Sequence, residues 1–465
     1  MRTTVRRLCL VVLLAMIATM AAACGGGGTG GTAATSETGG GAAATSAPGA
    51  PEATAATGGG TASAGACSDA GKGQQITMWS PLTGPDGDEM TQLANQFSKE
   101  NSLGITVKHT AQPDYLQKLN TAAAGNSLPE MTVIRAGDIG EMVARNVLKA
   151  MSDAALTEAG GADMLKGQFT EAVWNAGQVK DKRYTVPLDT HPLVLYYNKD
   201  MFQKAGITMP TDRPMTKEEF EKAVDALTKD GVAGVSIGTA FQTGAWFQGL
   251  IRQFGGDITN ADGTQATYNS EQGVQAATYI HDMKAKTTPQ VNGAGDPEVK
   301  LFQQQKAAMV FHGPWHISDM VKLPFVGFAQ MPQIGSSYSV WGNSHQLAMT
   351  TEDPAKQAAA GCWIGWLSQN SVQWAKAGQV PARKSARESA DLATVSPAVA
   401  AFAKEIEGVK FLPPVPGLES ALWGQGFEPP LNAYLLGQSQ DIKKGLDDAA
   451  TKSDQIIKDN AAKYK

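Results

Sequence analysis

The chain has 465 residues, of which 18% are charged and 7% are aromatic, and its formal net charge is −5. This length is sufficient for two or more hydrophobic cores. The acidic balance argues against a nucleic-acid partner and for a soluble acidic body. The 51 glycines also indicate that one part of the chain is poor in core-forming residues.

The first 24 residues have the pattern of an export signal. Three arginines precede an apolar run over 8–20, which has the length of a signal-peptide core and is short for a bilayer span. The sequence AAAC that follows resembles a bacterial lipobox, with Ala where that pattern usually has Leu. In that reading residues 1–23 are removed and Cys24 is diacylated. A signal peptide cut after the alanines and an uncleaved anchor are the alternatives.

Residues 24–70 are made almost wholly of Gly, Ala, Thr and Ser. Such a segment cannot bury enough apolar area to offset its ordering entropy, so we expect a flexible tether. With roughly 40 residues its r.m.s. reach is about 35–40 Å. A tether after an acylated cysteine would hold a soluble body at the outer face of a bacterial cytoplasmic membrane.

Two cysteines lie beyond the signal and the lipobox. Cys67 precedes the first expected strand, and Cys362 lies in an apolar helical stretch. Outside the cytoplasm two thiols can pair, and a disulfide would join the end of the tether to the body. The alternative is an exposed Cys67 and an inert, buried Cys362.

Strands and helices alternate from residue 75 onward. Expected strands and helices follow one another at 75–80, 88–100, 105–109, 115–124 and 129–134. This order is typical of a parallel α/β sheet. In such sheets, ligands bind where strands lead into helices, so the loops 80–88, 110–114 and 135–138 are candidate binding loops.

The stretch 186–207 predicts a strand that leaves one body and enters a second. Pro187 ends the preceding element, and Asp189, Thr190 and His191 follow as three consecutive polar residues. Behind them 193–197 is apolar and β-prone, as expected of a buried strand. We therefore expect a hinge crossing in which Asp189 and His191 face a ligand cleft. The alternative is that these polar groups only tie the hinge together.

A second alternation follows this crossing. Helices are expected at 216–228 with a capping box, at 245–253 and at 270–284, strands at 232–237, 307–311 and 326–331, and a hairpin at 257–268. The segment 339–349 then resembles a return crossing, 355–370 a helix, and 379–382 a third crossing. The predicted fold is α/β and two-lobed. Residues 71–188 with 345–380 and residues 189–344 with 381–465 would each form a mainly parallel sheet flanked by helices, with the ligand cleft between them.

Several segments resemble the family 1 extracellular solute-binding proteins of ABC importers. They are PLDTHPLVLYYNKDMFQKAGI, TNADGTQATYNSEQGVQAATYI, KAAMVFHGPWHISDM and GQVPARKSA, and their order and spacing together carry the resemblance. It extends from about residue 76 to the C-terminus. It implies a periplasmic-binding-protein-like fold, a sugar-like ligand captured by hinge closure, and delivery to ABC permease subunits with a cytoplasmic ATPase. We expect a monomer.

Tryptophans are the aromatic candidates for the cleft, because an aromatic face stacks on a sugar ring while hydrogen bonds read its hydroxyls. Trp315 follows a Gly-Pro that ends a strand, and the family often uses a Trp in that motif for stacking. Each candidate could instead pack in the core, as we expect for the helically spaced Trp363, Trp366 and Trp374. The aromatic candidates are Trp79, Trp246, Trp315, Trp341 and Trp423.

Polar candidates come from the loops and the crossings. Buried polar groups need partners, so a cleft lined by them expects a polyhydroxyl ligand or water. His191 stands where a maltose-binding member of the family has a ligand-reading carboxylate. A polyol phosphate or glycerophosphodiester, read by Arg135, His191 or Arg383, is the alternative ligand. The polar candidates are Asp86, Gln112, Arg135, Asp138, Asp189, His191, Asn343 and Arg383.

No catalytic residue, cofactor or metal site is expected. Asp138 and Asp189 could approach each other, yet nothing local marks a glycosidase acid–base pair, and a secreted hydrolase remains the rival class. His312 and His316 are four residues apart, but Gly313 and Pro314 break the helical geometry of a zinc motif. Walker A and nucleophile-elbow sequences are absent, so a partner would have to hydrolyse ATP.

Overall fold

The first lobe is built on a five-stranded sheet. The computed structural model describes residues 67–239, 241–287, 291–293 and 295–463. In the sheet β1 pairs in parallel with β2 and β3, whereas β12 runs antiparallel to β3 and β6. In spatial order its strands are β2 (Thr106–Ala111), β1 (Gln75–Ser80), β3 (Met131–Arg135), β12 (His345–Met349) and β6 (Thr185–Pro187). The return segment therefore completes a sheet begun much earlier in the chain.

Helices cover both faces of this sheet because its strands alternate between two cores. Met131 and Val133 of β3 face the core formed with α1 (Pro85–Glu100) and α13 (Pro354–Gln369). Ile134 faces the core formed with α2 (Tyr115–Ala124) and α3 (Ile139–Ala144). Predicted and observed bounds agree to within a few residues for α1, α2 and α13. The helices of the first lobe are α1 (Pro85–Glu100), α2 (Tyr115–Ala124), α3 (Ile139–Ala144), α4 (Asp153–Glu158), α5 (Ala162–Lys166), α6 (Glu171–Asn175), α13 (Pro354–Gln369) and α14 (Ser371–Trp374), with a hairpin of β4 (Gln178–Val179) and β5 (Lys182–Arg183).

The sheet of the second lobe differs from the prediction. Its order is β10 (Val326–Ala329), β8 (Val194–Asn198) and β9 (Met309–His312), and both pairs are antiparallel rather than parallel. The expected strand at 232–237 forms only isolated bridges, antiparallel at Val232 and parallel at Ala233 and Ser236. The expectation of a mainly parallel sheet is wrong for this lobe, because the central β8 has antiparallel neighbours on both sides.

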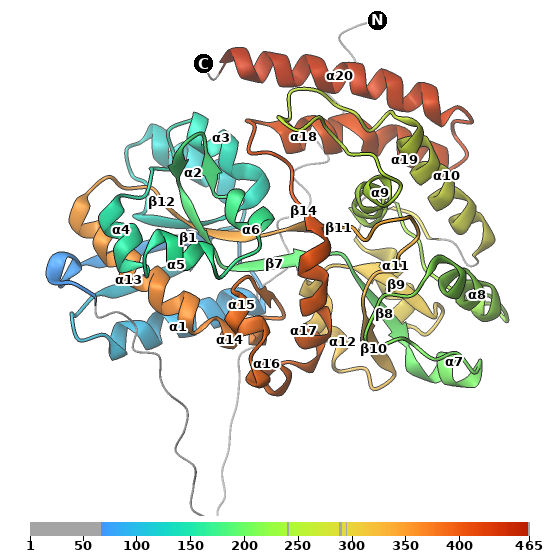
Figure 1. Ribbon diagram of the computed structural model, residues 1–465, viewed down its shortest axis with the longest axis horizontal. Coiled ribbons are helices and arrows are strands. Elements are labelled where there is room, and N and C mark those ends of the chain that lie inside the picture. Colours follow the sequence, from blue (N-terminus) through green and yellow to red (C-terminus); the bar gives the residue numbers. More distant parts are fainter. Residues whose placement is uncertain (1–66, 240, 288–290, 294, 464–465) are drawn as a thin grey trace, which may run out of the picture. The chain divides into compact units, whose positions relative to one another are not determined.

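Helices also sandwich the second sheet. Leu195 of β8 faces one core and Tyr196 faces the other, so the apolar run predicted at 193–197 serves both. The long α20 (Ile442–Lys463) lies across α18 (Leu418–Leu422) and α19 (Glu428–Leu435) (Figure 1). The remaining helices are α7 (Lys199–Lys204), α8 (Lys217–Leu227), α9 (Phe241–Gln253), α10 (Glu271–Lys286), α11 (Pro297–Gln303), α12 (Ile317–Met320), α15 (Lys384–Arg387), α16 (Ala390–Val395), α17 (Pro397–Phe402), α18 (Leu418–Leu422), α19 (Glu428–Leu435) and α20 (Ile442–Lys463).

A third sheet lies between the other two (Figure 1). Its order is β13 (Val380–Pro381), β7 (Asp189–Pro192), β11 (Val340–Asn343) and β14 (Val409–Lys410). One residue separates β6 from β7 and one separates β11 from β12, so the chain passes directly from sheet to sheet. The three predicted crossings thus contribute β7, β11 and β13 to one small sheet. This sheet supports the candidate site.

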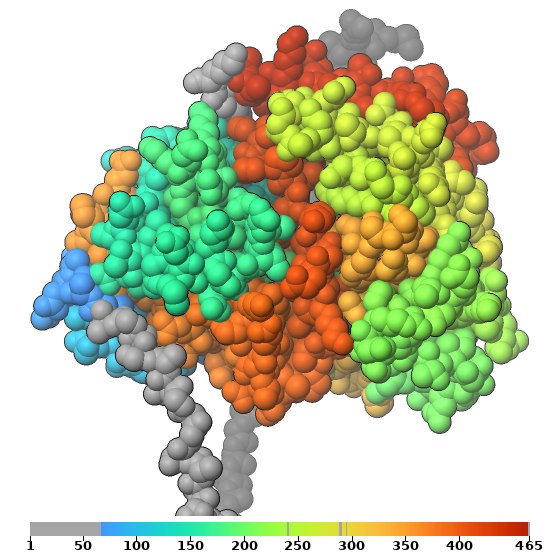
Figure 2. All heavy atoms as spheres, viewed as in Figure 1, coloured from blue at the N-terminus to red at the C-terminus, as the bar shows by residue number. Residues whose placement is uncertain are grey.

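The order of the chain is interleaved between the lobes. In Figure 2 the orange-red residues that follow the third crossing separate the blue and teal residues of the first lobe from the green and yellow residues of the second. Each lobe therefore draws on distant parts of the sequence. The division into 71–188 with 345–380 and 189–344 with 381–465 stays a prediction.

The described chain begins at a disulfide. Cys67 and Cys362 are bonded, with Cα atoms 5.8 Å apart. Residues 67–70, expected to end the tether, are therefore attached to α13, and Asp69–Gly71 forms a short 3-10 helix. Cys24, the signal peptide at 1–23 and the rest of the tether lie outside the described residues. Among the residues described, no helix combines the length and apolarity that a membrane crossing requires.

Candidate functional site

A cavity of about 460 Å³ is lined by residues from both lobes and the middle sheet. Seven predicted site residues line it: Asp86, Arg135, His191, Trp315, Trp341, Asn343 and Trp423. Four residues that the sequence analysis missed complete the lining: Phe241, His345, Gln379 and Glu419. The carboxyl ends of β3 and β9 and the crossings thus meet at one place, as expected for α/β lobes.

Four aromatic rings form one wall of the cavity. Phe241 lies nearly parallel to Trp423, with ring centroids 5.8 Å apart, and contacts Trp315 at 5.3 Å and Trp341 at 5.1 Å. Trp315 is 37% exposed, although most large apolar side chains of the described chain are buried. Gly313 and Pro314 end β9 and turn this indole toward the cavity. Such a wall can stack on the apolar face of a ring.

A histidine pair forms the floor of the cavity. His191 on β7 lies beside His345 on β12, with ring centroids 4.6 Å apart. Under them is Asp189, which is fully buried. Its carboxylate accepts hydrogen bonds from the His345 backbone N–H at 2.9 Å, from His345 Nδ1 at 2.8 Å, from Trp374 Nε1 at 2.9 Å and from His191 Nδ1 at 3.3 Å. These bonds fix the orientation of both imidazoles.

Burial and charge act in opposite directions on this group. Burial alone would raise the pKa of Asp189, but His345 and His191 hold it below its ordinary value. Burial lowers the pKa of His191 to about 4, so this ring is neutral near pH 7. Burial also disfavours the charged form of His345, yet the adjacent Asp189 carboxylate raises its pKa overall. The floor therefore presents a neutral imidazole and a carboxylate-paired imidazole.

Charged groups from the two lobes meet at the rim. Arg135 at the end of β3 donates to Asp138 at 3.0 Å, and Tyr115 donates to the same carboxylate oxygen at 2.6 Å. Glu419 comes from the second lobe. Burial, and then the neighbouring Asp138, raise the pKa of Glu419 to about 7, and Arg135 opposes this shift. A carboxyl group with that pKa can donate or accept a hydrogen bond near neutral pH.

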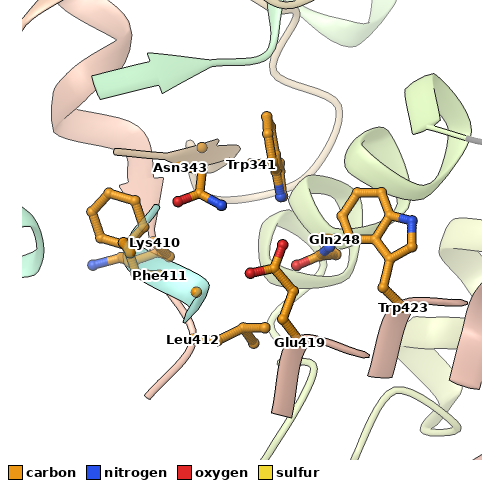
Figure 3. Close-up of a pocket in the computed structure, with 11 residues that line it drawn as sticks. Gln248, Trp341, Asn343, Lys410, Phe411, Leu412, Glu419 and Trp423 are labelled. Carbon is orange, nitrogen blue, oxygen red and sulfur yellow. The ribbon is translucent and has the colours of Figure 1, made fainter. Parts of the chain in front are cut away.

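A smaller pocket adjoins the cavity and shares four of its residues. In Figure 3 the Glu419 carboxylate points into the space below Asn343 and Trp341, with Trp423 to one side. Gln248 of α9 and Lys410 of β14 also line this pocket. The aromatic wall and the polar rim are therefore continuous.

Six predicted residues do not line the cavity. Trp246 is 2% exposed and packs against Phe311 in the core of the second lobe. Arg383 donates to Ser368 and Ser385, which supports the third crossing. Trp79 packs against the core beside α2 and α3, and Gln112 accepts a hydrogen bond from Lys118. Asp138 and Asp189 are occupied by the donors of the rim and of the floor.

The four missed residues carried only weak local signals. Glu419 precedes Trp423 by four residues in ESALWGQGF, so the two share a helix face, which could have identified it. His345 is a polar residue within the expected return strand. Phe241 and Gln379 are ordinary in type and position. Their roles arise from long-range packing, which no local pattern reports.

Two histidine–carboxylate groups have their potential ligand atoms within 4.8 Å of one another. One is Asp189 with His191 and His345 beneath the cavity, and the other is Asp296 with His312 and His316. The members of the first group hydrogen-bond one another, so no metal is needed to explain it.

The sequence is similar to those of known solute-binding proteins. A family model described as bacterial extracellular solute-binding protein matches residues 92–401. A binding protein of Brucella abortus (strain 2308) is 26% identical over 421 residues, which cover 84% of this chain and 94% of that protein. The sn-glycerol-3-phosphate-binding periplasmic protein UgpB of Shigella flexneri is 25% identical over 340 residues, which cover 67% of this chain and 75% of that protein.

Solved structures share the fold. The cyclic alpha-maltosyl-1,6-maltose binding protein of Arthrobacter globiformis superposes with a TM-score of 0.68 at 20% sequence identity. The match covers 83% of this chain and 99% of that one. The two-lobed arrangement with a cavity between the lobes is therefore the arrangement of periplasmic binding proteins.

Proposed function

We propose that this chain, which belongs to the bacterial extracellular solute-binding proteins, captures a sugar or small oligosaccharide between its two lobes. One observation carries the proposal: a wall of four aromatic rings faces polar groups across one cavity. Stacking on the C–H face of a sugar and hydrogen bonds to its hydroxyls need this combination. The Arthrobacter globiformis protein with the same fold is a binding protein for a cyclic maltosyl-maltose.

Capture would occur by hinge closure about the middle sheet. A ligand that contacts both lobes binds the closed form better, and so shifts the equilibrium toward closure. The closed form would then dock on ABC permease subunits whose cytoplasmic ATPase drives import. The family is extracellular, and we further propose that an acylated Cys24 and the tether hold the body at the membrane. We assign the chain no catalytic step.

A phosphorylated polyol is the second candidate. It is supported by the Shigella flexneri relative, which binds sn-glycerol 3-phosphate, and by Arg135 at the cavity. The carboxyl groups of Asp86 and Glu419 line the same cavity, and Arg135 is already paired with Asp138. A dianionic phosphate would be repelled by these carboxyl groups when they are ionised, so the cavity favours a neutral polyhydroxyl ligand.

A ligand screen tests the proposal. The protein is heated with maltooligosaccharides, monosaccharides, sn-glycerol 3-phosphate or glycerophosphodiesters, and the unfolding temperature is followed. One class should raise it saturably, because ligand binds only the folded state. Stabilisation by the phosphates alone would replace the sugar proposal with the second candidate. Chemical turnover of the stabilising ligand would contradict a binding-protein role.

Trp315 provides the matched test. Trp315→Ala should reduce the affinity for the stabilising sugar by more than about tenfold, since stacking contributes about 1 kcal/mol or more beyond area burial. Trp366→Ala, outside the cavity, is the control and should leave the affinity unchanged. An unchanged affinity in Trp315→Ala would remove this residue from the site.

A further inference from the structure

A second polar group lies behind the aromatic wall, outside the cavity. His312 ends β9, His316 ends the short 3-10 turn that follows, and Asp296 stands at the start of α11. Gly313 and Pro314 interrupt the helical spacing of a zinc motif, so no zinc site is expected here from the sequence. The structure brings the two imidazoles together nevertheless, with ring centroids 4.3 Å apart. The 3-10 turn places His316 beside His312, as one turn of an α-helix would.

The group lacks the hydrogen bonds that such burial requires. The His312 side chain is 2% exposed, and neither ring nitrogen has a hydrogen-bond partner among the described residues. His316 Nε2 has none either. Buried polar atoms are nearly always hydrogen-bonded, so these unpaired ring nitrogens need an explanation. Asp296 adds a further sign: it occupies the N-cap of α11, yet its side chain makes no cap hydrogen bond.

The distances between these atoms suit a shared metal ion better than direct bonds. His312 Nε2 is 3.5 Å from Asp296 Oδ1, and His316 Nε2 is 3.7 Å from Asp296 Oδ2. Zinc–ligand bonds of about 2.0–2.1 Å in a tetrahedron separate neighbouring ligand atoms by about 3.3 Å. Two imidazoles and a carboxylate are a ligand set that Zn²⁺ favours. Glu298, with one carboxylate oxygen 3.8 Å from His312 Nε2, adds negative charge beside them.

We propose that Asp296, His312 and His316 bind one Zn²⁺ ion, a site distinct from the sugar cavity. The fourth position would be taken by water. Asp296 is 45% exposed, so an ion can enter from solvent. The other two groups of this kind in the described chain are less suitable: Asp189, His191 and His345 satisfy one another, and Cys67 and Cys362, beside Glu158, form a disulfide.

The site would act on the aromatic wall through direct contact. The His312 ring meets Trp315 edge-on at 5.4 Å and Phe241 at 5.4 Å. A metal that holds His312 and His316 would fix the turn between them, on which Trp315 lies. The ion would therefore preorganise the stacking surface without touching the ligand.

Metal titration tests the site. The full-length protein without a histidine tag is stripped with chelator and titrated with ZnCl₂, and bound zinc is measured after equilibrium dialysis. One equivalent should bind saturably and raise the unfolding temperature. Co²⁺ in its place should show the visible absorption of tetrahedral coordination. Absence of saturable binding would overturn the proposal, because the two histidines would then be only a buried pair beside carboxylates.

Variants locate the ion. Asp296 and His316 are partly exposed, so their replacement should leave the fold intact. Asp296→Asn and His316→Asn should each weaken zinc binding by more than about tenfold. His281→Asn, at a surface histidine, should leave zinc binding unchanged. Equal binding in Asp296→Asn, His316→Asn and the wild type would show that the ion binds elsewhere.

Discussion

At the scale of single residues, Asp189 connects three parts of the chain. It lies on β7, and its carboxylate accepts from His345 on β12, from Trp374 on α14 and from its neighbour His191. Each oxygen accepts two hydrogen bonds, so all four lone-pair positions have protein donors. The sequence left open whether this aspartate reads the ligand or ties the hinge. These contacts favour the second interpretation.

Replacing Asp189 should therefore affect stability first. Asp189→Asn removes a fully buried charge and places an amide donor against other donors, so we expect a loss of about 3–5 kcal/mol of unfolding free energy. Urea titration measures it. Asp225→Asn, at an exposed position of α8, should change stability by less than about 0.5 kcal/mol. A loss below about 1 kcal/mol for Asp189→Asn would contradict this role.

Glu405 is a second buried carboxyl group, and it does not line the cavity. It accepts from the Met331 backbone N–H at 2.5 Å and from the Tyr338 hydroxyl. Burial raises the pKa of Glu405 from 4.5 to about 8, although both hydrogen bonds oppose the shift. Its environment thus keeps a proton that the unfolded chain would release at lower pH.

This shift predicts the sign of a pH dependence. Because the folded pKa lies above the unfolded one, the contribution of Glu405 is fully present below about pH 4.5 and is lost as pH rises toward about 8. The free energy of unfolding of the wild type should therefore fall, relative to Glu405→Gln, across that window. Denaturant titrations at several pH values give the difference. Glu352→Gln, at an exposed position, should show no such divergence; a parallel course for Glu405→Gln would contradict the prediction.

At the scale of elements, local patterns predicted most of the longer helices but gave the wrong strand pairing for the second sheet. The capping box of Thr216 and Glu219 is present at the start of α8. The strand expected at 232–237 is reduced to isolated bridges at Val232, Ala233 and Ser236. Within this segment Gly234 lies directly against α8, where an added Cβ would stand 2.3 Å from the Val224 carbonyl oxygen. Propensity favoured a strand, and the segment packs against a helix instead of pairing continuously.

The disulfide belongs to this scale, since it fastens the first short helix to α13. Cys67→Ser and Cys362→Ser should each cost about 2–4 kcal/mol of unfolding free energy, because the bond closes a loop of 295 residues in the unfolded chain. Thiol titration and urea unfolding with and without reductant measure this. The reduced wild type should match the variants; a reductant-insensitive wild type would show that the bond contributes nothing.

At the scale of the whole described body, the lobes touch through glycines. Gly137 and Gly140 belong to the first lobe, and Glu419 and Pro414 to the C-terminal part that packs with the second. A Cβ at Gly140 would lie 2.3 Å from the Pro414 carbonyl oxygen, and one at Gly137 would collide with the Glu419 carboxylate. The neighbour of Gly140 is a backbone carbonyl, which cannot shift as easily as the side-chain tip of Glu419 beside Gly137. Close approach of the lobes thus depends on Gly140.

Gly140→Ala should therefore hinder closure. We expect the affinity for the sugar that stabilises the protein to fall by about tenfold or more, with little change in unliganded stability, since Ala favours a helix. Calorimetric titration measures the affinity. Gly167→Ala, where the added Cβ meets only ordinary contacts, is the control. Equal affinities would mean that ligand binding does not require the lobe contact seen here.

The sequence by itself determined the alternation of strands and helices in the first lobe, the longer helices and the buried strand 193–197 of the second, the three crossings and the family. These follow from periodicity, from Pro and Gly breaks and from the order of motifs, all of which are local or additive along the chain. It also identified seven residues of the cavity, because loops after strands and aromatic residues after Gly-Pro carry local signals.

Only the tertiary structure decided how the side chains combine. It buried Asp189, placed Trp246 in a core, brought Phe241, His345, Gln379 and Glu419 into the cavity, made the second sheet antiparallel and joined His312, His316 and Asp296. Each of these outcomes depends on contacts between residues far apart in the chain. The free energy of such contacts depends on burial and on the partners of each group, and neither can be read from the residue type alone.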